Sequence, residues 1–390
     1  MSITAPQGFR AAGVSAGLKR SGNSDVALLV NDGPEFAAAG VFTRNRVRAA
    51  PVRWTAALFS QYPSGGGELT AVVLNSGGAN ACTGRDGFAD TVNTAERAAS
   101  ALSTDPERVA VCSTGLIGER LPMPALLAGV DSAVAALAGG QRAGMAAAAA
   151  IMTTDTVAKT VVVHGDGFIV GGMAKGAGML APGLATMLVV LTTDADVPPD
   201  ELTSALRAAT RVTFDRLDSD GAMSTNDTVL LLASGASGTR PDEARFAAAI
   251  HRACAELAAA LLADAEGASK EIAIEVVHAA SEDDAVEVGR SVARNNLVKT
   301  AFFGQDPNWG RILAAVGTTA AAFEPDRLDV AINGVWICRG GATGDDRSGV
   351  DLSGRSVHVV VDLHAGAETA TVHTNDLSHA YVHENSAYSS

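Results

Sequence analysis

Short apolar runs rich in β-branched residues recur along the chain and predict β-strands. Most are bounded by Gly, Asp, Asn or Ser, the residues that favour turns between strands. The expected strands cover residues 26–30, 70–75, 109–113, 160–164, 186–191, 228–233, 272–278, 330–333 and 357–363. A further apolar run at 335–339 follows the run at 330–333 almost at once, which predicts an antiparallel hairpin.

Four segments combine a helical repeat of apolar positions with signals for a helix start. Proline or acidic residues precede the apolar faces of the segments that begin near Pro198, Pro241 and Ser281, as expected in a first helical turn. The fourth segment begins near Pro122 without a Ser, Thr, Asp or Asn cap and ends near Leu137. Core packing explains the apolar stripe of each helix.

The predicted strands and helices alternate irregularly, unlike the strict alternation of a parallel doubly wound fold. Together with the hairpin, this order predicts an α+β fold in which helices are layered on antiparallel or mixed sheets. A chain of 390 residues can bury one large core or two medium ones. The sequence contains no visible internal repeat.

Charge and hydropathy restrict the partners that the chain can have. The net charge is −14, which argues against a nucleic-acid partner because no broad basic face can be expected. An anionic substrate must therefore be held by a few local cations or backbone N–H groups. No apolar run approaches the ~20 residues that span a membrane, and the first residues do not resemble a signal peptide. We therefore expect a cytoplasmic protein without a membrane partner.

The cysteines and histidines give no metal signature. Cys82, Cys112, Cys254 and Cys338 are widely spaced and form no CxxC pair, so we expect buried, reduced thiols. The eight histidines form no HExxH or other paired motif, and the sequence predicts no metal site. A GxSxG motif is absent, although spacing alone leaves a Ser–His–Asp triad open.

The bond between Ala185 and Thr186 joins a glycine-rich loop, residues 172–185, to the apolar run at 186–191. If that bond breaks, Thr186 becomes a chain terminus with a hydroxyl nucleophile and its own amine as base. Such an amine has an unperturbed pKa of about 7.7–8.0, close to working pH. From residue types alone, a threonine at the start of a buried strand is usually an ordinary β-branched strand residue.

A second candidate for acyl-transfer chemistry follows the predicted strand at 109–113. The segment from Cys112 to Gly118 contains two glycines, and a glycine-containing loop can present backbone N–H groups to an oxyanion. The alternative is an ordinary turn between a strand and a helix.

Further polar residues could line a substrate pocket. Lys175 comes early in the glycine-rich loop and a strand follows, an order that argues against a phosphate-binding loop. It could contact a substrate carboxylate or be a solvated surface lysine. Thr153 and Thr154 could contact substrate or mark a helix end. Glu266 follows the long helix, where a carboxylate is unfavourable to the helix dipole, so we expect either another task or a solvated side chain.

The segment Lys-Gly-Ala-Gly-Met-Leu-Ala-Pro-Gly-Leu-Ala-Thr-Met-Leu, from Lys175 onward, closely resembles the autocleavage motif of the ornithine acetyltransferases, also called glutamate N-acetyltransferases. The common form of the motif has Asn-Met where this chain has Gly183 and Leu184. The resemblance extends over nearly the whole chain and includes residues 75–80, 220–227 and 306–311, to which we assign no chemical role. It implies an N-terminal-nucleophile-like fold of the ornithine acetyltransferase type.

The resemblance also implies roles for individual residues. Thr186 would be the nucleophile, with its freed amine as base, and Thr114 and Gly115 would form the oxyanion hole. Glu266 would pair with the amino group of the substrate. His373 stands where tryptophan is common in the family, which leaves the local packing open. The implied substrate-binding residues are Thr153, Thr154, Lys175, Thr186, Glu266, Asn385 and Ser390.

The implied activity is transfer of an acetyl group from N2-acetylornithine to glutamate, through an acetyl ester on Thr186, in arginine biosynthesis. Cleavage would yield fragments 1–185 and 186–390, which associate as an α2β2 tetramer. The reaction needs no cofactor or metal, and acetyl-coenzyme A stays open as a second donor. Two alternatives remain: a threonine-nucleophile amidase or aminopeptidase that passes the acyl group to water, and a non-catalytic binding module.

Overall fold

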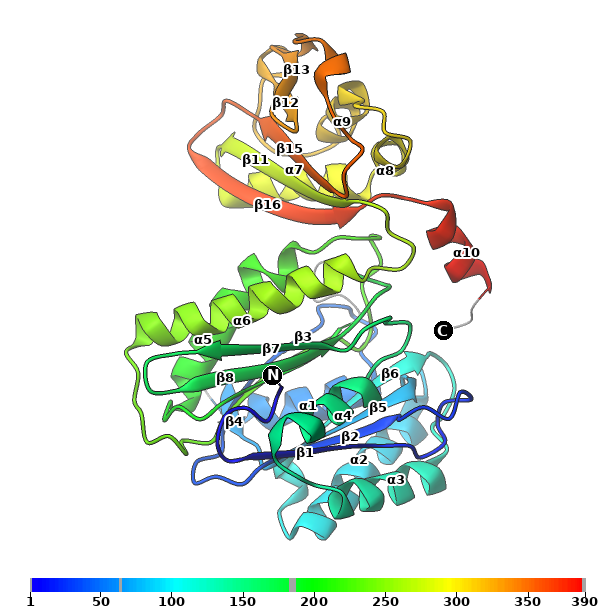
Figure 1. Cartoon of the computed structure of the whole chain (residues 1–390), viewed down its shortest axis with the longest axis vertical. Coiled ribbons are helices and arrows are strands. Elements are labelled where there is room, and N and C mark those ends of the chain that lie inside the picture. The colour runs from blue at the N-terminus through cyan, green and yellow to red at the C-terminus, as the bar shows by residue number, and fades with distance from the viewer. Residues whose placement is uncertain (1, 63–64, 182–186, 388–390) are drawn as a thin grey trace.

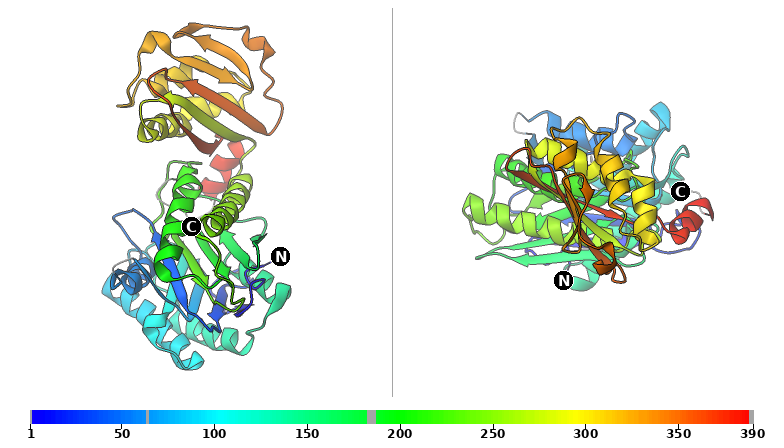
Figure 2. Two further views of the ribbon diagram at one scale, coloured as in Figure 1. Left: turned by 90° about the vertical axis from the view of Figure 1, so that its left-hand side faces the viewer. Right: turned by 90° about the horizontal axis from the view of Figure 1, so that it is seen from above.

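The computed structural model describes residues 2–62, 65–181 and 187–387 of the chain. These residues form a large lobe and a smaller C-terminal lobe (Figure 1). Two further views show the lobes stacked along the longest axis of the molecule (Figure 2). Ala185, Thr186 and Ser390, which carry three of the sequence-based predictions, lie outside the described residues.

The large lobe contains two sheets. In the first sheet all pairs are antiparallel except β5 with β6. In the second, only β9 and β10 pair in parallel. The first sheet has the order β1 (Phe9–Val14), β2 (Val26–Asn31), β5 (Ala71–Gly78) and β6 (Val109–Leu116). The second has the order β4 (Gly66–Glu68), β3 (Ala37–Phe42), β10 (Thr228–Ala233), β9 (Leu188–Thr193), β8 (Ile169–Lys175) and β7 (Lys159–His164).

The two sheets face each other across a shared apolar core, to which Leu29 and Leu74 contribute from one side and Val190 and Leu230 from the other. Helices cover both outer faces, so the layers run helix, sheet, sheet, helix. The cover of the first sheet is α2 (Gly84–Leu102) and α3 (Met123–Ala135). The cover of the second is α5 (Pro199–Val212) and α6 (Glu243–Ala263). Contributions to the central core also come from α1 (Ala50–Ser60) and α4 (Gly140–Ala150).

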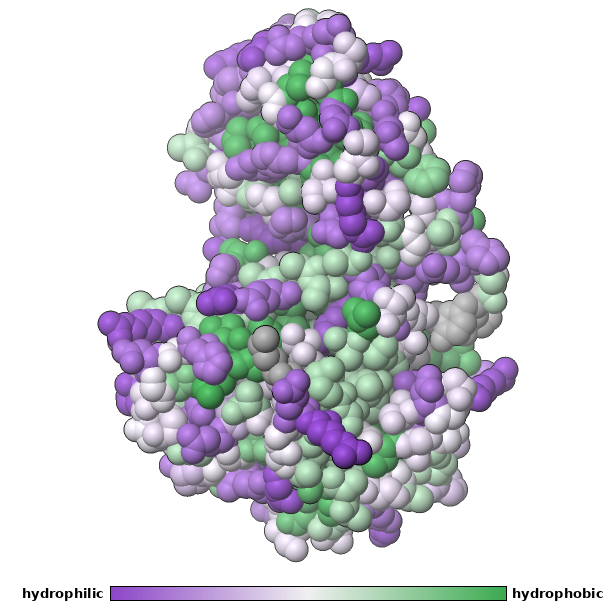
Figure 3. All heavy atoms as spheres, in the orientation of Figure 1, coloured by the Kyte–Doolittle hydropathy of each residue, from purple (hydrophilic) through white to green (hydrophobic). Residues whose placement is uncertain are grey.

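The small lobe contains one mixed sheet. Its strands and the helices of this lobe enclose a common apolar core. Hydrophilic side chains cover much of its visible surface (Figure 3). The strand order is β14 (Ala342–Thr343), β13 (Val335–Arg339), β12 (Asp329–Ile332), β15 (Ser356–Asp362), β11 (Glu271–Ala279) and β16 (Glu368–Asn375). The helices are α7 (Glu282–Arg294), α8 (Asn296–Phe303), α9 (Trp309–Val316) and the terminal α10 (His379–Ala387). Short 3-10 helices lie at Pro106–Arg108, Phe214–Arg216, Pro325–Arg327 and Arg347–Gly349.

The α+β fold with layered helices is confirmed, and the predicted strands and helices are present within a few residues. Two predicted helix starts use side-chain caps. Ser281 accepts the Asp284 N–H at 3.1 Å, and Asp242 accepts the Arg245 N–H at 2.9 Å. The hairpin of β12 and β13 is antiparallel. The run predicted as a strand at 186–191 begins at Leu188 among the described residues.

Two predictions are wrong. The glycine-rich segment 172–185 is not a loop throughout, because its first four residues belong to β8 and pair with β7 and β9. Glycine at these positions gives close packing: a Cβ on Gly172 would lie 2.7 Å from Leu191. Cys82 is exposed, whereas the other three cysteines are buried free thiols as expected.

Helix α6 is the one helix in the described part of the chain that is long and apolar enough to cross a membrane. Its apolar stripe is not free, because Phe246, Ile250, Leu257 and Leu261 are buried in the core beneath the second sheet. The helix therefore serves as a core element of the large lobe.

Polar contacts join the two lobes. The Arg294 side chain from α7 donates to the buried Asp218 at 2.7 Å. The Lys299 ammonium donates to the Ser219 carbonyl at 2.6 Å, and burial lowers the pKa of Lys299 to about 8. His373 packs at this junction, where its carbonyl accepts the Asp218 N–H at 2.8 Å. These contacts hold α7, α8 and β16 of the small lobe against the segment that leads to β10.

Candidate active site

One pocket of about 110 Å³ brings together most of the predicted site residues from five distant parts of the chain. Thr114 and Gly115 lie near the end of β6, Lys175 ends β8, and Glu266 follows α6. The lining residues are Thr114, Gly115, Ile117, Thr153, Thr154, Lys175, Gly178, Met179, Glu266 and Asn385. All predicted site residues within the described chain therefore meet in one place, whereas their chemical roles stay predictions.

Lys175 is the buried cation of this pocket, with 1% of its surface exposed. Its Nζ donates to the Thr114 hydroxyl at 3.2 Å. Burial lowers the pKa of Lys175, an effect that nearby Asp155 opposes. Lys175 is therefore not the solvated surface lysine that the sequence left open.

Gly115 lies where β6 runs alongside β5. Its φ of +126° belongs to the region that favours glycine, and a Cβ would lie 2.6 Å from the Gly78 nitrogen. A side chain at this position would force β5 and β6 apart. The sequence left open whether residues 112–118 form a turn or an anion-binding loop. The structure shows that β6 extends to Leu116, so Gly115 still lies in a strand.

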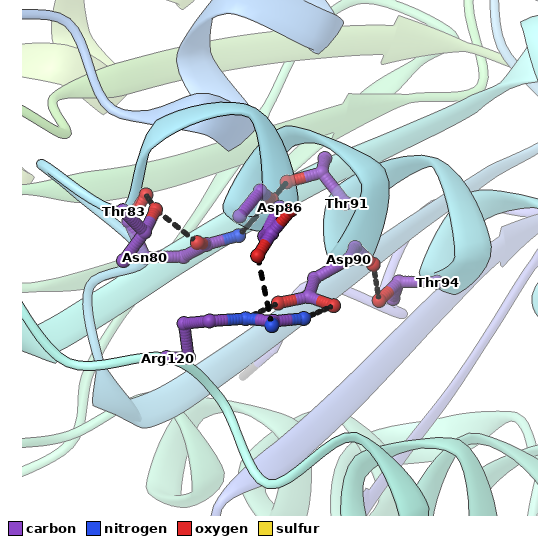
Figure 4. A network of polar contacts seen from close by, with 8 residues as sticks. Asn80, Thr83, Asp86, Asp90, Thr91, Thr94 and Arg120 are labelled. Atoms are coloured by element: carbon purple, nitrogen blue, oxygen red, sulfur yellow. Dashed lines mark hydrogen bonds and ion pairs between the residues drawn. The ribbon is translucent and has the colours of Figure 1, made fainter.

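The loop that leaves β6 is anchored to α2 by a polar network (Figure 4). Arg120 donates Nη2 to Asp90 Oδ1 at 2.7 Å and Nε to Asp90 Oδ2 at 3.0 Å, which is the paired geometry that orients a guanidinium most strongly. Asn80 donates to the Gly87 carbonyl at 2.8 Å and to Thr91 at 3.0 Å. These bonds attach to α2 both the chain that leaves β6 and the chain that leaves the neighbouring strand β5.

Residues 75–80 and 220–227, which had no assigned role, brace the same segment. Asn226 donates to the Ala79 carbonyl at 2.7 Å and to the Ser113 carbonyl at 2.8 Å. Ser113 in turn donates to Asn75 at 2.6 Å. Residues 306–311, which also had no assigned role, lie in the small lobe. There the Asn308 side chain caps α9, and Arg311 donates to the Leu297 carbonyl at 2.7 Å. Both residues thus have structural contacts in the small lobe.

Glu266 forms the opposite wall of the pocket. Its N–H donates to the Ala177 carbonyl at 2.9 Å, and its Oε2 accepts from Asn385 of α10 at 2.9 Å. A Cβ on Gly178 would lie 2.5 Å from Glu266 Oε2, so glycine is needed for the carboxylate to reach this place. The C-terminal segment is therefore not frayed at Asn385 but completes the pocket.

A buried ion-pair network that sequence reasoning missed supports the pocket from behind. Lys159 Nζ lies 2.6 Å from both Asp155 Oδ1 and Asp264 Oδ2, and its side chain is 1% exposed. Asp155 also accepts the Thr153 N–H at 3.0 Å and the Gly176 N–H at 2.7 Å. Burial alone would raise the pKa of Asp155, but the Lys175 and Lys159 ammonium groups lower it overall.

Asp227 also had no chemical role assigned from the sequence. It is fully buried, and its Oδ1 accepts the N–H of Met187, the residue directly after Thr186, at 3.2 Å. Its Oδ2 has no hydrogen-bond partner among the described residues. Burial raises the pKa of Asp227 well above its usual range, while contacts with Ser224, Met187 and Lys175 oppose this rise. The carboxyl group therefore binds the first described residue after the predicted cleavage point in the sequence.

The pocket thus offers a buried ammonium group, a hydroxyl and a carboxylate to one small ligand. Residues 10–390 match the model of the ArgJ family, and the chain belongs to this family. The resemblance noted from the sequence is thereby confirmed, as is the expectation of an acyltransferase of arginine biosynthesis that acts on small molecules.

Several relatives carry the same description. The chain is 64% identical to the "Arginine biosynthesis bifunctional protein ArgJ" of Thermobifida fusca, over 100% of both chains. It is 65% identical to the protein of that name from Streptomyces avermitilis, again over 100% of both. A solved ornithine acetyltransferase from Mycobacterium tuberculosis, complexed with ornithine, is 58% identical. That match covers 48% of this chain and 96% of the solved chain, with a TM-score of 0.45.

Proposed function

We propose that this chain transfers an acetyl group from N2-acetylornithine to glutamate after it has cut itself between Ala185 and Thr186. The observation that carries this proposal is the convergence of Thr114, Gly115, Lys175 and Glu266 on one pocket. The ArgJ relatives are named as bifunctional arginine biosynthesis proteins, and the solved relative from M. tuberculosis holds ornithine. Both observations support an amino-acid substrate of this class.

In the proposed reaction Thr186 Oγ attacks the acetyl carbonyl while the α-amine of Thr186 accepts its proton. The Thr114 hydroxyl and the Gly115 N–H would stabilise the oxyanion. The bond from the acetyl carbon to nitrogen then breaks, and ornithine leaves with the proton. The amine of glutamate attacks the resulting ester, Thr186 Oγ regains a proton, and N-acetylglutamate is released.

Substrate contacts in this scheme follow the charges of the pocket. Glu266 would pair with the amino group of ornithine, and Lys175 would attract a substrate carboxylate. Thr153 and Thr154 would contribute contacts from the loop after α4, with Asn385 and Ser390 from the C-terminal segment. The scheme uses no cofactor. We also propose that the protein is located in the cytoplasm.

The same chemistry can serve the cleavage step. Thr186 Oγ would attack the Ala185 carbonyl to give an ester that water hydrolyses. Fragments 1–185 and 186–390 would stay together, because β8 and β9 pair across the cut from Val170 with Thr193 to Lys175 with Leu188. We propose that two copies of each fragment then form the α2β2 tetramer, which light scattering on the purified protein would measure.

An assay with and without glutamate separates acetyl transfer from hydrolysis. The purified protein is incubated with N2-acetylornithine, and the products are measured by mass spectrometry. Apart from the single equivalent of ornithine per active site that is released when the Thr186 ester forms, ornithine and N-acetylglutamate should appear in equal amounts and only when glutamate is present. Release of acetate at the same rate without glutamate would favour the amidase alternative instead. A parallel incubation with acetyl-coenzyme A and glutamate determines whether that donor is accepted.

Replacement of Thr114 by valine should lower kcat about 10²–10³-fold, the usual effect of losing one oxyanion donor. Valine retains the β-branched shape but lacks the hydroxyl that contacts Lys175 Nζ. Thr114→Ser is the matched control and should keep most of the activity. Both variants are compared with wild type as cleaved material, verified by intact mass. Unchanged kcat in cleaved Thr114→Val would remove this hydroxyl from the oxyanion hole.

A further inference from the structure

A group of metal-ligating side chains lies at the far edge of the small lobe, away from the active-site pocket. It consists of His278, Asp362 and His364, whose potential ligand atoms all lie within 4.8 Å of one another. His278 is near the end of β11, and Asp362 ends β15. The two strands are parallel, with Val277 opposite Asp362, so their carboxyl ends meet at one edge of the sheet.

This group is well separated from the proposed catalytic chemistry. Strand β11 begins at Glu271, shortly after Glu266 of the pocket, and His278 follows seven residues later. At about 3.3 Å per residue the strand carries His278 roughly 23 Å from its beginning. The cluster therefore needs an explanation other than substrate binding.

Both imidazoles direct their Nδ1 atoms toward the same carboxylate. His278 Nδ1 lies 2.8 Å from Asp362 Oδ2, and His364 Nδ1 lies 3.5 Å from Asp362 Oδ1. The rings are nearly parallel, with an angle of 17° and centroids 6.1 Å apart. One imidazole near the end of β11 and one just after β15 thus lie on the two oxygens of the same carboxylate.

The other nitrogen of His364 is already occupied by a second carboxylate. His364 Nε2 lies 3.0 Å from Asp329 Oδ2, and Asp329 Oδ1 accepts the Gly340 N–H at 2.7 Å. Metal-binding histidines typically donate their second ring N–H to such a carboxylate, which selects the tautomer and orients the ring. In the tautomer that donates Nε2–H to Asp329, Nδ1 of His364 carries the lone pair that a metal ion next to Asp362 would need.

The backbone holds both histidines in an uncommon conformation. His278 has φ +50° and His364 has φ +49°, in the left-handed region that side chains larger than glycine seldom adopt. The conformation is maintained by hydrogen bonds: the His364 N–H donates to Asp362 Oδ1 at 3.0 Å, and the Ala365 and Gly366 N–H groups donate to the His278 carbonyl. Strain of this kind is often found at ligand sites.

We infer that His278, Asp362 and His364 bind a divalent transition-metal ion such as Zn²⁺, with water completing the coordination. Ligand atoms about 2.0–2.1 Å from Zn²⁺ in tetrahedral geometry are about 3.3–3.4 Å apart. The distance from His364 Nδ1 to Asp362 Oδ1, 3.5 Å, is close to this value. The distance from His278 Nδ1 to Asp362 Oδ2, 2.8 Å, must open by about 0.5 Å, and Asp362 must turn so that one of its oxygens lies next to both imidazoles. Two imidazoles and one carboxylate favour such ions over Mg²⁺ or Ca²⁺, which prefer oxygen ligands.

The bound ion would join β11 to β15 directly and would reach β12 through Asp329. Because it binds the folded small lobe and not the separated strands, it would stabilise this lobe. The histidine spacing in the sequence gave no such signal, since residues 278 and 364 become neighbours only through the parallel pairing of β11 with β15.

The test uses the full-length protein, treated with a chelator and then freed of it, and titrated with ZnCl₂ in a calorimeter. We expect one ion per chain at this site and a higher thermal unfolding temperature when Zn²⁺ is added. His278→Ala and His364→Ala should each weaken this binding at least tenfold. His358→Ala is the matched control, because His358 lies on β15 and faces Glu275 at 2.9 Å instead of the cluster. It should leave binding unchanged.

A measurement on wild type keeps the inference testable if a variant fails to fold. Nuclear magnetic resonance of the ring nitrogens should show that Zn²⁺ shifts the signals of two of the eight histidines, and Co²⁺ should give a visible absorption band typical of nitrogen coordination. Absence of binding, equal affinity in the double variant His278→Ala/His364→Ala, or shifts at other histidines would overturn the site. The cluster would then be a pair of His–Asp contacts without a metal function. None of these outcomes bears on whether the protein transfers acetyl groups without Zn²⁺, so the metal site and the proposed function are tested separately.

Discussion

Replacement of Thr186 by alanine is expected to leave the purified protein as one uncut chain with no acetyl transfer. Alanine has no oxygen to attack the Ala185 carbonyl and none to carry the acetyl ester. Without cleavage the α-amine at position 186 also stays in a peptide bond and cannot act as a base. We therefore expect kcat to fall to the limit of detection, measured by mass spectrometry of both the protein and the reaction products.

Thr186→Ser is the matched variant for this experiment. It retains a hydroxyl at the same position, so it should still cut itself, although without the methyl group that restricts the rotamer. N-terminal sequencing of wild type should yield a second terminus that begins Thr-Met-Leu-Val-Val. Full turnover by an uncut Thr186→Ala chain, or an acetyl adduct on another residue, would disprove the proposed mechanism.

Replacement of Asp155 by asparagine should lower both stability and substrate binding. The Asp155 carboxylate accepts from Lys159, Thr153 and Gly176 in a buried place. Loss of one partner from a buried ion pair typically costs about 3–5 kcal/mol. We expect the lower end of this range, because Asp264 still pairs with Lys159. The free energy of unfolding, measured in urea, should fall accordingly, and KM should rise because Thr153 and Gly176 lose their anchor.

Asp131→Asn provides the control with the same chemical change at an exposed ion pair. Asp131 pairs with Arg97, and their side chains are 40% and 51% exposed. Exposed pairs contribute about 0–1 kcal/mol, so this variant should resemble wild type in stability and in KM. If both variants lost the same stability, the Asp155 network would not be a buried anchor of the pocket.

Local sequence signals were sufficient for much of the fold. Runs of β-branched residues predicted strands such as β10 and β15, because burial on a pleated surface requires them. The proline and acidic residues after Pro241 and the serine at 281 located the starts of α6 and α7, where the structure shows Asp242 and Ser281 as caps. The same signals failed at β8, where Gly171 and Gly172 look like a loop in sequence but sit in a crowded sheet interior. There, packing against neighbouring strands outweighed the local preference of glycine.

The sequence likewise pointed to some residues of the candidate site and missed others. The resemblance to a family singled out Thr114, Lys175 and Glu266, and the structure brings them to one pocket, whereas their chemical roles stay predictions. Asp155, Lys159 and Asp227 could not be anticipated in the same way. A lone charged residue gives no sign in the sequence that it will be buried, because its burial depends on partners that come from other elements.

Local patterns along the chain were enough to place many of its strands, four of its helices and the acyl-transfer motif. They were enough because apolar periodicity, caps and motifs act over a few neighbouring residues. Folding of the whole chain was needed to bring Thr114, Lys175, Glu266 and Asn385 into one pocket and to place His278 beside Asp362. Those neighbours are set by the order and direction of strands in each sheet, and this order is a property of the whole chain.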